Sequence, residues 1–298
     1  VDFLGNSAKG AQRWINIAGF NMQPSEFAKV GLIITLAAIL HRRPANTLPT
    51  FLRALAFTVP PWLLVFIQPD LGTSLVFGAI ALVMLYWANA NPGWLVLLVS
   101  PLVAAILYSL SIPLWIVWAV LMGVIGWLTL PWRWVSSLLA IAVNIGFGLL
   151  GQVFWYVLKE YQKDRLIVFL NPEKYPLGAG YHLIQSRIAI GAGEFWGQGL
   201  NQGTQTQLNF IPEQHTDFIF SSVGEELGFV GAICLLLTFL LLCWRLLRVA
   251  CQAPNNFGSL LAIGILAMIG FQTIVNISMT IGIAPVTGIP LPLISYGG

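Results

Sequence analysis

Ionisable side chains gather between residues 213 and 217, where Glu213, His215 and Asp217 fall within a single short segment. So dense a group in an otherwise apolar chain could carry chemistry. The alternative is structural, because Thr216 suits the N-cap of the apolar helix that follows. Asp217 would then lie in the first helical turn, where the helix dipole favours an anion. The residues alone leave both interpretations open.

A second candidate is the pair Glu26 and Lys29, which follows Pro24. Pro24 can start a helix, and the spacing then places both charged side chains on one face, one turn apart. An ion pair so close to hydrocarbon is costly, so such groups usually face a cavity or a partner. The alternative is an interfacial pair that only orients the helix.

Two further polar segments, residues 9–14 and 68–74, have good structural explanations. Arg13 and Trp14 are residue types that anchor a chain at the membrane interface. Asp70 directly precedes an apolar run, and on local evidence it is the N-cap of the helix that begins there. Neither segment by itself indicates a functional site.

The elements that must position these residues are membrane spans. Hydrophobic residues make up 57% of the 298 residues and charged residues only 8%, against roughly 25% charged in an ordinary soluble domain. Apolar runs of about 17–25 residues recur, and each can cross a hydrocarbon core of about 30 Å. This composition excludes a soluble protein and predicts an all-α, polytopic transmembrane helix bundle. We expect about eight spans, at residues 25–41, 52–68, 71–88, 93–110, 112–130, 132–158, 218–244 and 257–281.

The charges between these spans are distributed unevenly. The short connections after the first, third, fifth and seventh spans carry six basic residues and no acidic one, whereas the opposite side carries all eleven acidic residues. The positive-inside rule makes the first set cytoplasmic. All four polar segments therefore belong to the extracytoplasmic side.

That side also holds the only long connection, residues 159–217. Its apolar pattern predicts a short amphipathic helix near residues 181–190. Glycines between 178 and 203 match neither the dinucleotide nor the phosphate-loop spacing and indicate turns. The three cysteines have no metal-ligand spacing. Both chain ends look cut, so we expect a fragment of a longer protein.

Six ordered motifs connect these segments to a known family: GAQRW, QPSEFAK, QPDLGTS, NPEKYPLGAGYHLIQSRIAIGAG, IPEQHTDFIFSSVGEELG and GIPLPLISYGG. Together they closely resemble the RodA branch of the RodA/FtsW/SpoVE (SEDS) family of cell-wall polymerases. The resemblance implies one SEDS domain over residues 1–298, taken from a ten-span fold and truncated at both ends. Residues 93–130 look like an added transmembrane hairpin, expected to pack peripherally without a catalytic role.

The resemblance implies a peptidoglycan glycosyltransferase that joins the disaccharides of lipid II during cell elongation and releases undecaprenyl pyrophosphate. The essential acid of the HTDF motif falls on Asp217, the expected general base. Mg²⁺ or Mn²⁺ is a plausible cofactor, with unknown ligands. Expected cavity and substrate-binding residues are Arg13, Trp14, Glu26, Lys29, Asp70, Lys163, Arg165, Gln185, Ser186, Arg187 and His215.

The family also implies a location and partners. We expect a multi-pass protein of the bacterial cytoplasmic membrane, with its site on the extracytoplasmic face. Its partners would be membrane lipid, lipid-linked glycan and a class B penicillin-binding protein, and we expect no nucleic acid.

Two other function classes deserve a test. A lipid II flippase should show ionisable groups near mid-span and internal repeats, whereas these mid-spans are nearly free of charge. A scaffold that only recruits a partner would bind it normally and form no polymer.

Overall fold

The protein is described by a computed structural model in which the chain divides into two compact units. The first unit comprises Val1–Arg43, Leu52–Met84 and Asp164–Gly298, and the second comprises Pro44–Phe51 and Leu85–Lys163. The structure describes residues 5–8, 11–17, 20–68, 70–157, 180–208, 210 and 215–296.

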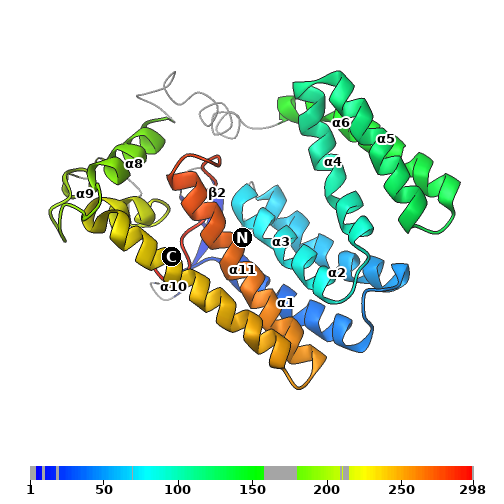
Figure 1. The fold of residues 1–298 in the computed structure, drawn as a ribbon, viewed down its shortest axis with the longest axis horizontal. Helices are drawn as coiled ribbons and strands as arrows, with labels where there is room; N and C mark the ends of the chain where they lie inside the picture. The colour runs from blue at the N-terminus through cyan, green and yellow to red at the C-terminus, as the bar shows by residue number, and fades with distance from the viewer. Residues whose placement is uncertain are drawn as a thin grey trace. The chain divides into compact units, whose positions relative to one another are not determined.

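Helices occupy all eight predicted spans, which confirms the all-α transmembrane bundle (Figure 1). Seven of the described helices are long and apolar enough to cross a membrane, and α3, with 17 residues, is a shorter apolar helix. Their bounds are α1 Pro24–Arg42, α2 Leu48–Ile67, α3 Leu71–Trp87, α4 Pro92–Leu110, α5 Ile112–Thr129, α6 Arg133–Val157, α10 Ile219–Gln252 and α11 Asn256–Thr280.

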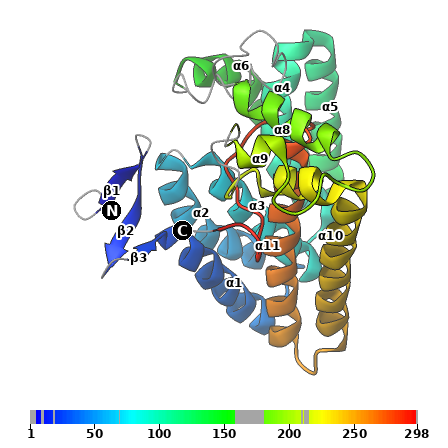
Figure 2. The ribbon, with the colours of Figure 1, turned by 90° about the vertical axis from the view of Figure 1, so that its left-hand side faces the viewer.

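A small antiparallel sheet before α1 was not predicted from the sequence. Strands β1 (Gly5–Ala8), β2 (Ala11–Ile17) and β3 (Phe20–Met22) pair in the order β1-β2-β3 (Figure 2). We expected only a polar segment here. The sheet satisfies the backbone hydrogen-bonding groups of that segment locally and leads directly into α1.

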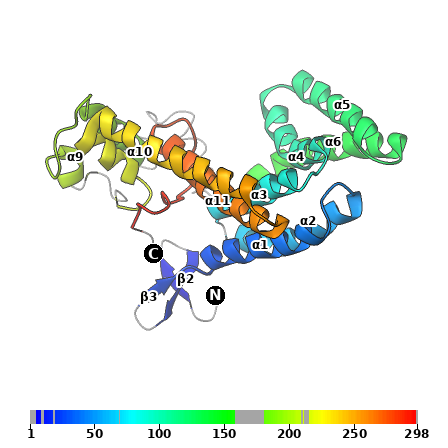
Figure 3. The ribbon, with the colours of Figure 1, turned by 60° about the horizontal axis from the view of Figure 1, so that its bottom comes forward.

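The core of the first unit lies where α1, α3 and α11 meet. A Cβ atom added to Gly264 of α11 would lie 2.5 Å from Ile33 of α1 and 3.0 Å from Met84 of α3. Without a side chain at this position, Ile33 and Met84 pack directly on the backbone of α11, and small residues serve in this way in many membrane helix packings. Helix α11 also lies along α1 and α10 (Figure 3).

Helix α10 is broken near its start. Gly228 has φ 64° and ψ −162°, a backbone conformation that essentially only glycine adopts. The amides of Phe229 and Val230, freed by the break, donate to the carbonyls of Glu194 and Phe195. A loop thus satisfies the backbone groups that the break leaves without a helical partner, as a broken span requires.

The predicted helix in the long connection is confirmed as α8 (Tyr181–Ala192), and a single turn, α9 (Thr204–Gln207), follows it. Helix α8 packs against α10 and buries Leu183 and Ala189, whereas Ile188 of the expected apolar face is 46% exposed. Packing against α10, and not the apolar pattern of α8 alone, therefore decides which face of α8 is buried.

The second unit contains α4, α5 and α6 packed on one another. Asn144 of α6 is fully buried, and its side-chain amide donates to the hydroxyl of Ser100 on α4 at 3.0 Å. The backbone carbonyl of Asn144 accepts from the indole of Trp115 on α5 at 3.2 Å. Helices α4 and α5 form the hairpin at residues 93–130. That this hairpin is additional to the family fold stays a prediction.

Candidate active site

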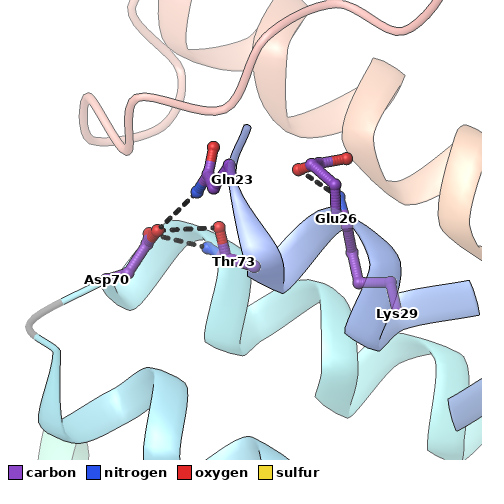
Figure 4. A network of polar contacts seen from close by, with 5 residues as sticks. All are labelled: Gln23, Glu26, Lys29, Asp70 and Thr73. Carbon is purple, nitrogen blue, oxygen red and sulfur yellow. Dashed lines mark hydrogen bonds and ion pairs between the residues drawn. The ribbon is translucent and has the colours of Figure 1, made fainter. Parts of the chain in front are cut away.

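Asp70 caps α3 and at the same time joins α3 to the start of α1. Its carboxylate accepts from the backbone amide of Thr73 at 3.1 Å and from the Thr73 hydroxyl at 3.0 Å, which is the geometry of an N-cap. The amide of Gln23, just before α1, also donates to it at 3.3 Å (Figure 4). The predicted cap is confirmed, and the contact with Gln23 goes beyond it.

The predicted pairing of Glu26 with Lys29 is also present. The Lys29 ammonium donates to the Glu26 carboxylate at 2.8 Å, one turn along α1 (Figure 4). The Lys29 side chain is 1% exposed, whereas that of Glu26 is 44% exposed. The pair therefore connects a buried cation to an accessible carboxylate beside Asp70 and Gln23.

The segment that follows α11 packs against the first turn of α3. A Cβ atom added to Gly72 would lie 2.8 Å from both the Thr287 carbonyl and the Ile289 side chain. The lack of a side chain at Gly72 thus permits close approach of the C-terminal segment, residues 282–296. This contact brings two of the six motifs together.

Asp217 lies in a turn before α10 and is partly buried. Helix α10 begins at Ile219 and its N-cap is Phe218, without a side-chain cap hydrogen bond. The interpretation of Thr216 as N-cap and Asp217 as a first-turn residue was therefore wrong, because the chain becomes helical two residues later. Asp217 belongs to the loop and not to the helix.

Asn276 of α11 connects this loop to the C-terminal segment. Its amide donates to the Asp217 carbonyl at 2.9 Å and to the Ile289 carbonyl at 2.8 Å. Ile289 in turn contacts Gly72. The beginnings of α1, α3 and α10 and the end of α11 therefore gather at one end of the first unit.

A cavity of about 480 Å³ opens at this end, lined by His215, Ile219, Ile294 and Tyr296. His215, predicted as a cavity residue, is exposed and forms part of this lining. Two of the lining residues, His215 and Ile219, lie two positions before and after Asp217 in the sequence. A substrate there would lie next to the loop that carries the carboxylate.

The three predicted residues on α8 have different surroundings. Ser186 is fully buried and lies between helices, with its hydroxyl 2.6 Å from that of Ser221 and 2.8 Å from the Thr280 carbonyl. Arg187 is exposed and donates to the Ile281 carbonyl at the end of α11 at 3.4 Å. Gln185 is partly buried. Ser186 thus connects α8 to α10 and α11.

Glu225 is a buried acid whose role the sequence did not reveal. Its side chain is fully buried, and its carboxylate accepts from the backbone amides of Gln205 and Thr206 at 2.8 and 3.0 Å and from both threonine hydroxyls of α9. Glu225 therefore holds the α9 turn against α10. Its one signal in the sequence is that Glu225 and Glu226 follow shortly after Glu213 and Asp217.

The other predicted residues are placed less completely. Arg13 and Trp14 lie on β2, and Lys163 and Arg165 lie outside the described residues. Within the described part of the chain, no group of three or more His, Cys, Asp or Glu side chains is placed to hold a metal ion. The described residues therefore assign no metal ligand.

A family model described as "Cell cycle protein" (FTSW_RODA_SPOVE) matches residues 1–122 and 114–298. The peptidoglycan glycosyltransferase MrdB of Escherichia coli K12 is 37% identical over 302 residues, which cover 100% of this chain and 69% of MrdB. The peptidoglycan glycosyltransferase RodA of Treponema pallidum is 38% identical over 327 residues, covering 99% of this chain and 75% of RodA.

Solved structures agree with these similarities. A chain from work on the structural coordination of polymerization and crosslinking by a peptidoglycan synthase complex matches with a TM-score of 0.67 and 31% identity, over 98% of this chain and 69% of that one. The rod shape determining protein RodA of Thermus thermophilus matches with a TM-score of 0.55 and 26% identity, over 98% of this chain and 65% of that one.

Proposed function

We propose that this chain, which belongs to the FtsW/RodA/SpoVE family, is a peptidoglycan glycosyltransferase that polymerises lipid II during cell elongation. The observation that carries the proposal is its match, over 99–100% of its length, to proteins that are named peptidoglycan glycosyltransferases. The site geometry supports it, because the matching polar motifs meet at one end of a membrane-spanning unit.

The reaction we propose uses Asp217 as general base. Its carboxylate takes the proton from the 4-hydroxyl of the acceptor sugar while the hydroxyl oxygen attacks the anomeric carbon of the donor. The bond from that carbon to the pyrophosphate oxygen breaks, and undecaprenyl pyrophosphate leaves with the bonding electrons. Attack from the opposite side inverts the anomeric carbon and gives a β-1,4 link.

The leaving pyrophosphate needs compensating positive charge. Of the cations predicted for this role, Lys29 and Arg187 have described side chains. Lys29 is the buried partner of Glu26 and is already oriented, whereas Arg187 is exposed at the end of α11. We propose that Arg187 meets the pyrophosphate and that Lys29 orients the Glu26 carboxylate.

We propose that a divalent cation, if it takes part, arrives with the substrate pyrophosphate. Magnesium commonly binds through one or two carboxylates together with substrate phosphates. Because the described residues assign no metal ligand, we derive no step through a metal. We expect a chelator to lower activity only if the pyrophosphate itself brings the ion.

We also propose the location and the partner. The protein is a multi-pass membrane protein, and we place its site on the extracytoplasmic face of the bacterial cytoplasmic membrane because every acidic residue falls on the side opposite the uncompensated arginines. One structural relative comes from a peptidoglycan synthase complex that couples polymerization with crosslinking. A class B penicillin-binding protein is therefore the partner we propose.

The substitution Asp217→Asn tests the assignment of the base. A positioned general base contributes roughly 10²–10⁴-fold to a rate, so we expect polymerisation of lipid II by the purified full protein to fall by about that factor. Glu226→Gln is the matched control, because it removes one negative charge from the same end of α10 and should keep wild-type activity. Full activity of Asp217→Asn overturns the assignment.

A further inference from the structure

The loop that carries Asp217 is held by hydrogen bonds from α11 and from the segment that follows α11. The carbonyl of His215 accepts from the backbone amide of Tyr296 at 2.9 Å. The carbonyl of Thr216 accepts from the Ser295 hydroxyl at 2.6 Å, and that of Asp217 from the Asn276 amide at 2.9 Å. Three consecutive carbonyls are therefore bound by α11 or the segment that follows it.

These contacts add order to a turn that lies outside the helix. Residues 215–217 form a turn ahead of α10, and Phe218, the N-cap of α10, accepts from the Ser221 amide through its carbonyl. A peptide unit is planar, so fixing the direction of successive carbonyls fixes the backbone dihedrals between them. The direction in which the Asp217 side chain leaves the backbone is fixed with them.

Two of the donors are side chains that cannot easily turn away. Asn276 is fully buried, and its Nδ2 group donates to two carbonyls, those of Asp217 and Ile289. The Ser295 hydroxyl donates to Thr216 and accepts from the Leu291 amide at 2.8 Å. Each side chain is therefore bound to two backbone groups.

The same contacts connect the loop to the cap of α3. Ile289, which accepts from Asn276, packs on Gly72 in the first turn of α3. Asp70 caps that turn and binds Gln23 at the start of α1. The backbone of Asp217 is thus connected, through Asn276 and the C-terminal segment, to the part of the site that α1 and α3 build.

We propose that Asn276 and Ser295 are positioning residues that hold the Asp217 carboxylate in its working direction. The inference rests on the proposed function of Asp217 as the base. Neither residue needs to touch substrate, since both bind backbone carbonyls. Misplacing a catalytic group by about 1 Å can cost about 10²-fold in rate, so their loss should affect chemistry more than binding.

The variants Asn276→Ala and Ser295→Ala of the full protein test this inference. We expect kcat for lipid II polymerisation to fall about 10- to 100-fold in each, with the Kd for lipid II near its wild-type value. The thermal unfolding midpoint should stay near wild type in Ser295→Ala and fall in Asn276→Ala, which leaves two carbonyls without their donor. Thr280→Val is the matched control: Thr280 is equally buried on α11, but its hydroxyl donates only to Ile277 of the same helix. It should keep wild-type kcat.

Ser295→Ala keeps the test decisive should Asn276→Ala fail to fold, because it removes the two hydrogen bonds of the Ser295 hydroxyl, both outside α11, and leaves that helix intact. Wild-type kcat in Ser295→Ala, or a parallel fall in kcat, lipid II binding and unfolding midpoint, overturns the inference. The two failures are distinguishable. Full activity of Asp217→Asn would overturn the assignment of Asp217 as the base, whereas the results for Asn276→Ala and Ser295→Ala test only how Asp217 is positioned.

Discussion

At the scale of single residues, the buried ammonium of Lys29 is neutralised by the Glu26 carboxylate, which solvent can reach. Lys29 is 1% exposed and Glu26 is 44% exposed, so the two partners lose different amounts of hydration. A charge buried without its partner is strongly destabilising, whereas an exposed one is not. The two single substitutions should therefore have unequal effects.

We expect Glu26→Gln to lower the free energy of unfolding by about 1–2 kcal/mol, which is less than the roughly 3–5 kcal/mol for breaking a fully buried pair because Glu26 is partly exposed. Lys29→Met should cost less, since it leaves only the accessible carboxylate. In the double variant, Lys29→Met should recover much of the stability lost in Glu26→Gln. Thermal or denaturant unfolding of the four proteins in detergent measures this cycle, and strictly additive effects would contradict it.

The sequence predicted the site residues whose partners lie within a few positions. The Asp70 cap and the Glu26–Lys29 pair follow from helical spacing, which any apolar helix imposes. It did not predict Asn276, because its partner Asp217 lies 59 residues away along the chain. Glu225 was missed for the same reason, since its donors come from a loop about 20 residues earlier.

At the scale of elements, the approach of the C-terminal segment to α3 depends on a missing side chain. Any Cβ at Gly72 would overlap the Thr287 carbonyl and Ile289. A carbonyl is part of the backbone and cannot rotate aside as a side chain can. The segment that holds Asn276 and the Asp217 loop would have to move.

We expect Gly72→Ala to lower the free energy of unfolding by about 1–3 kcal/mol through overpacking, and to lower the polymerisation rate because Ile289 shifts. Gly78→Ala on the same helix is the matched control, because nothing lies within 4 Å of an added Cβ there. It should be neutral or stabilise by up to about 1 kcal/mol through helix propensity. Equal behaviour of the two variants, in unfolding midpoint and in rate, would sink this account of Gly72.

Hydropathy was sufficient to predict the eight apolar helices α1–α6, α10 and α11, because a span must satisfy its own backbone and bury apolar side chains in lipid. It was not sufficient for the sheet at residues 5–22, whose strands have only three to seven residues each and mix polar with apolar side chains. The break at Gly228 was also missed, because it depends on pairing with the loop at Glu194 and Phe195.

At the scale of the whole molecule, sidedness separates an enzyme from a transporter. The polar motifs gather at one end of the first unit, and all eleven acids of the sequence belong to one predicted side. A flippase would have to carry a charged headgroup through mid-spans that are nearly free of charge. A polymerase needs its ionisable groups only on the side of the membrane where the lipid II headgroups lie.

The most direct measurement uses sealed vesicles that contain the full protein, with its extracytoplasmic side facing outward and lipid II only in the outer leaflet. Glycan chains and lipid II in each leaflet are quantified for wild type and Asp217→Asn. Our account predicts polymer on the outside with wild type, almost none with Asp217→Asn, and no lipid II moved across the bilayer by either. Translocation without polymer, or polymer made equally well by Asp217→Asn, would contradict it.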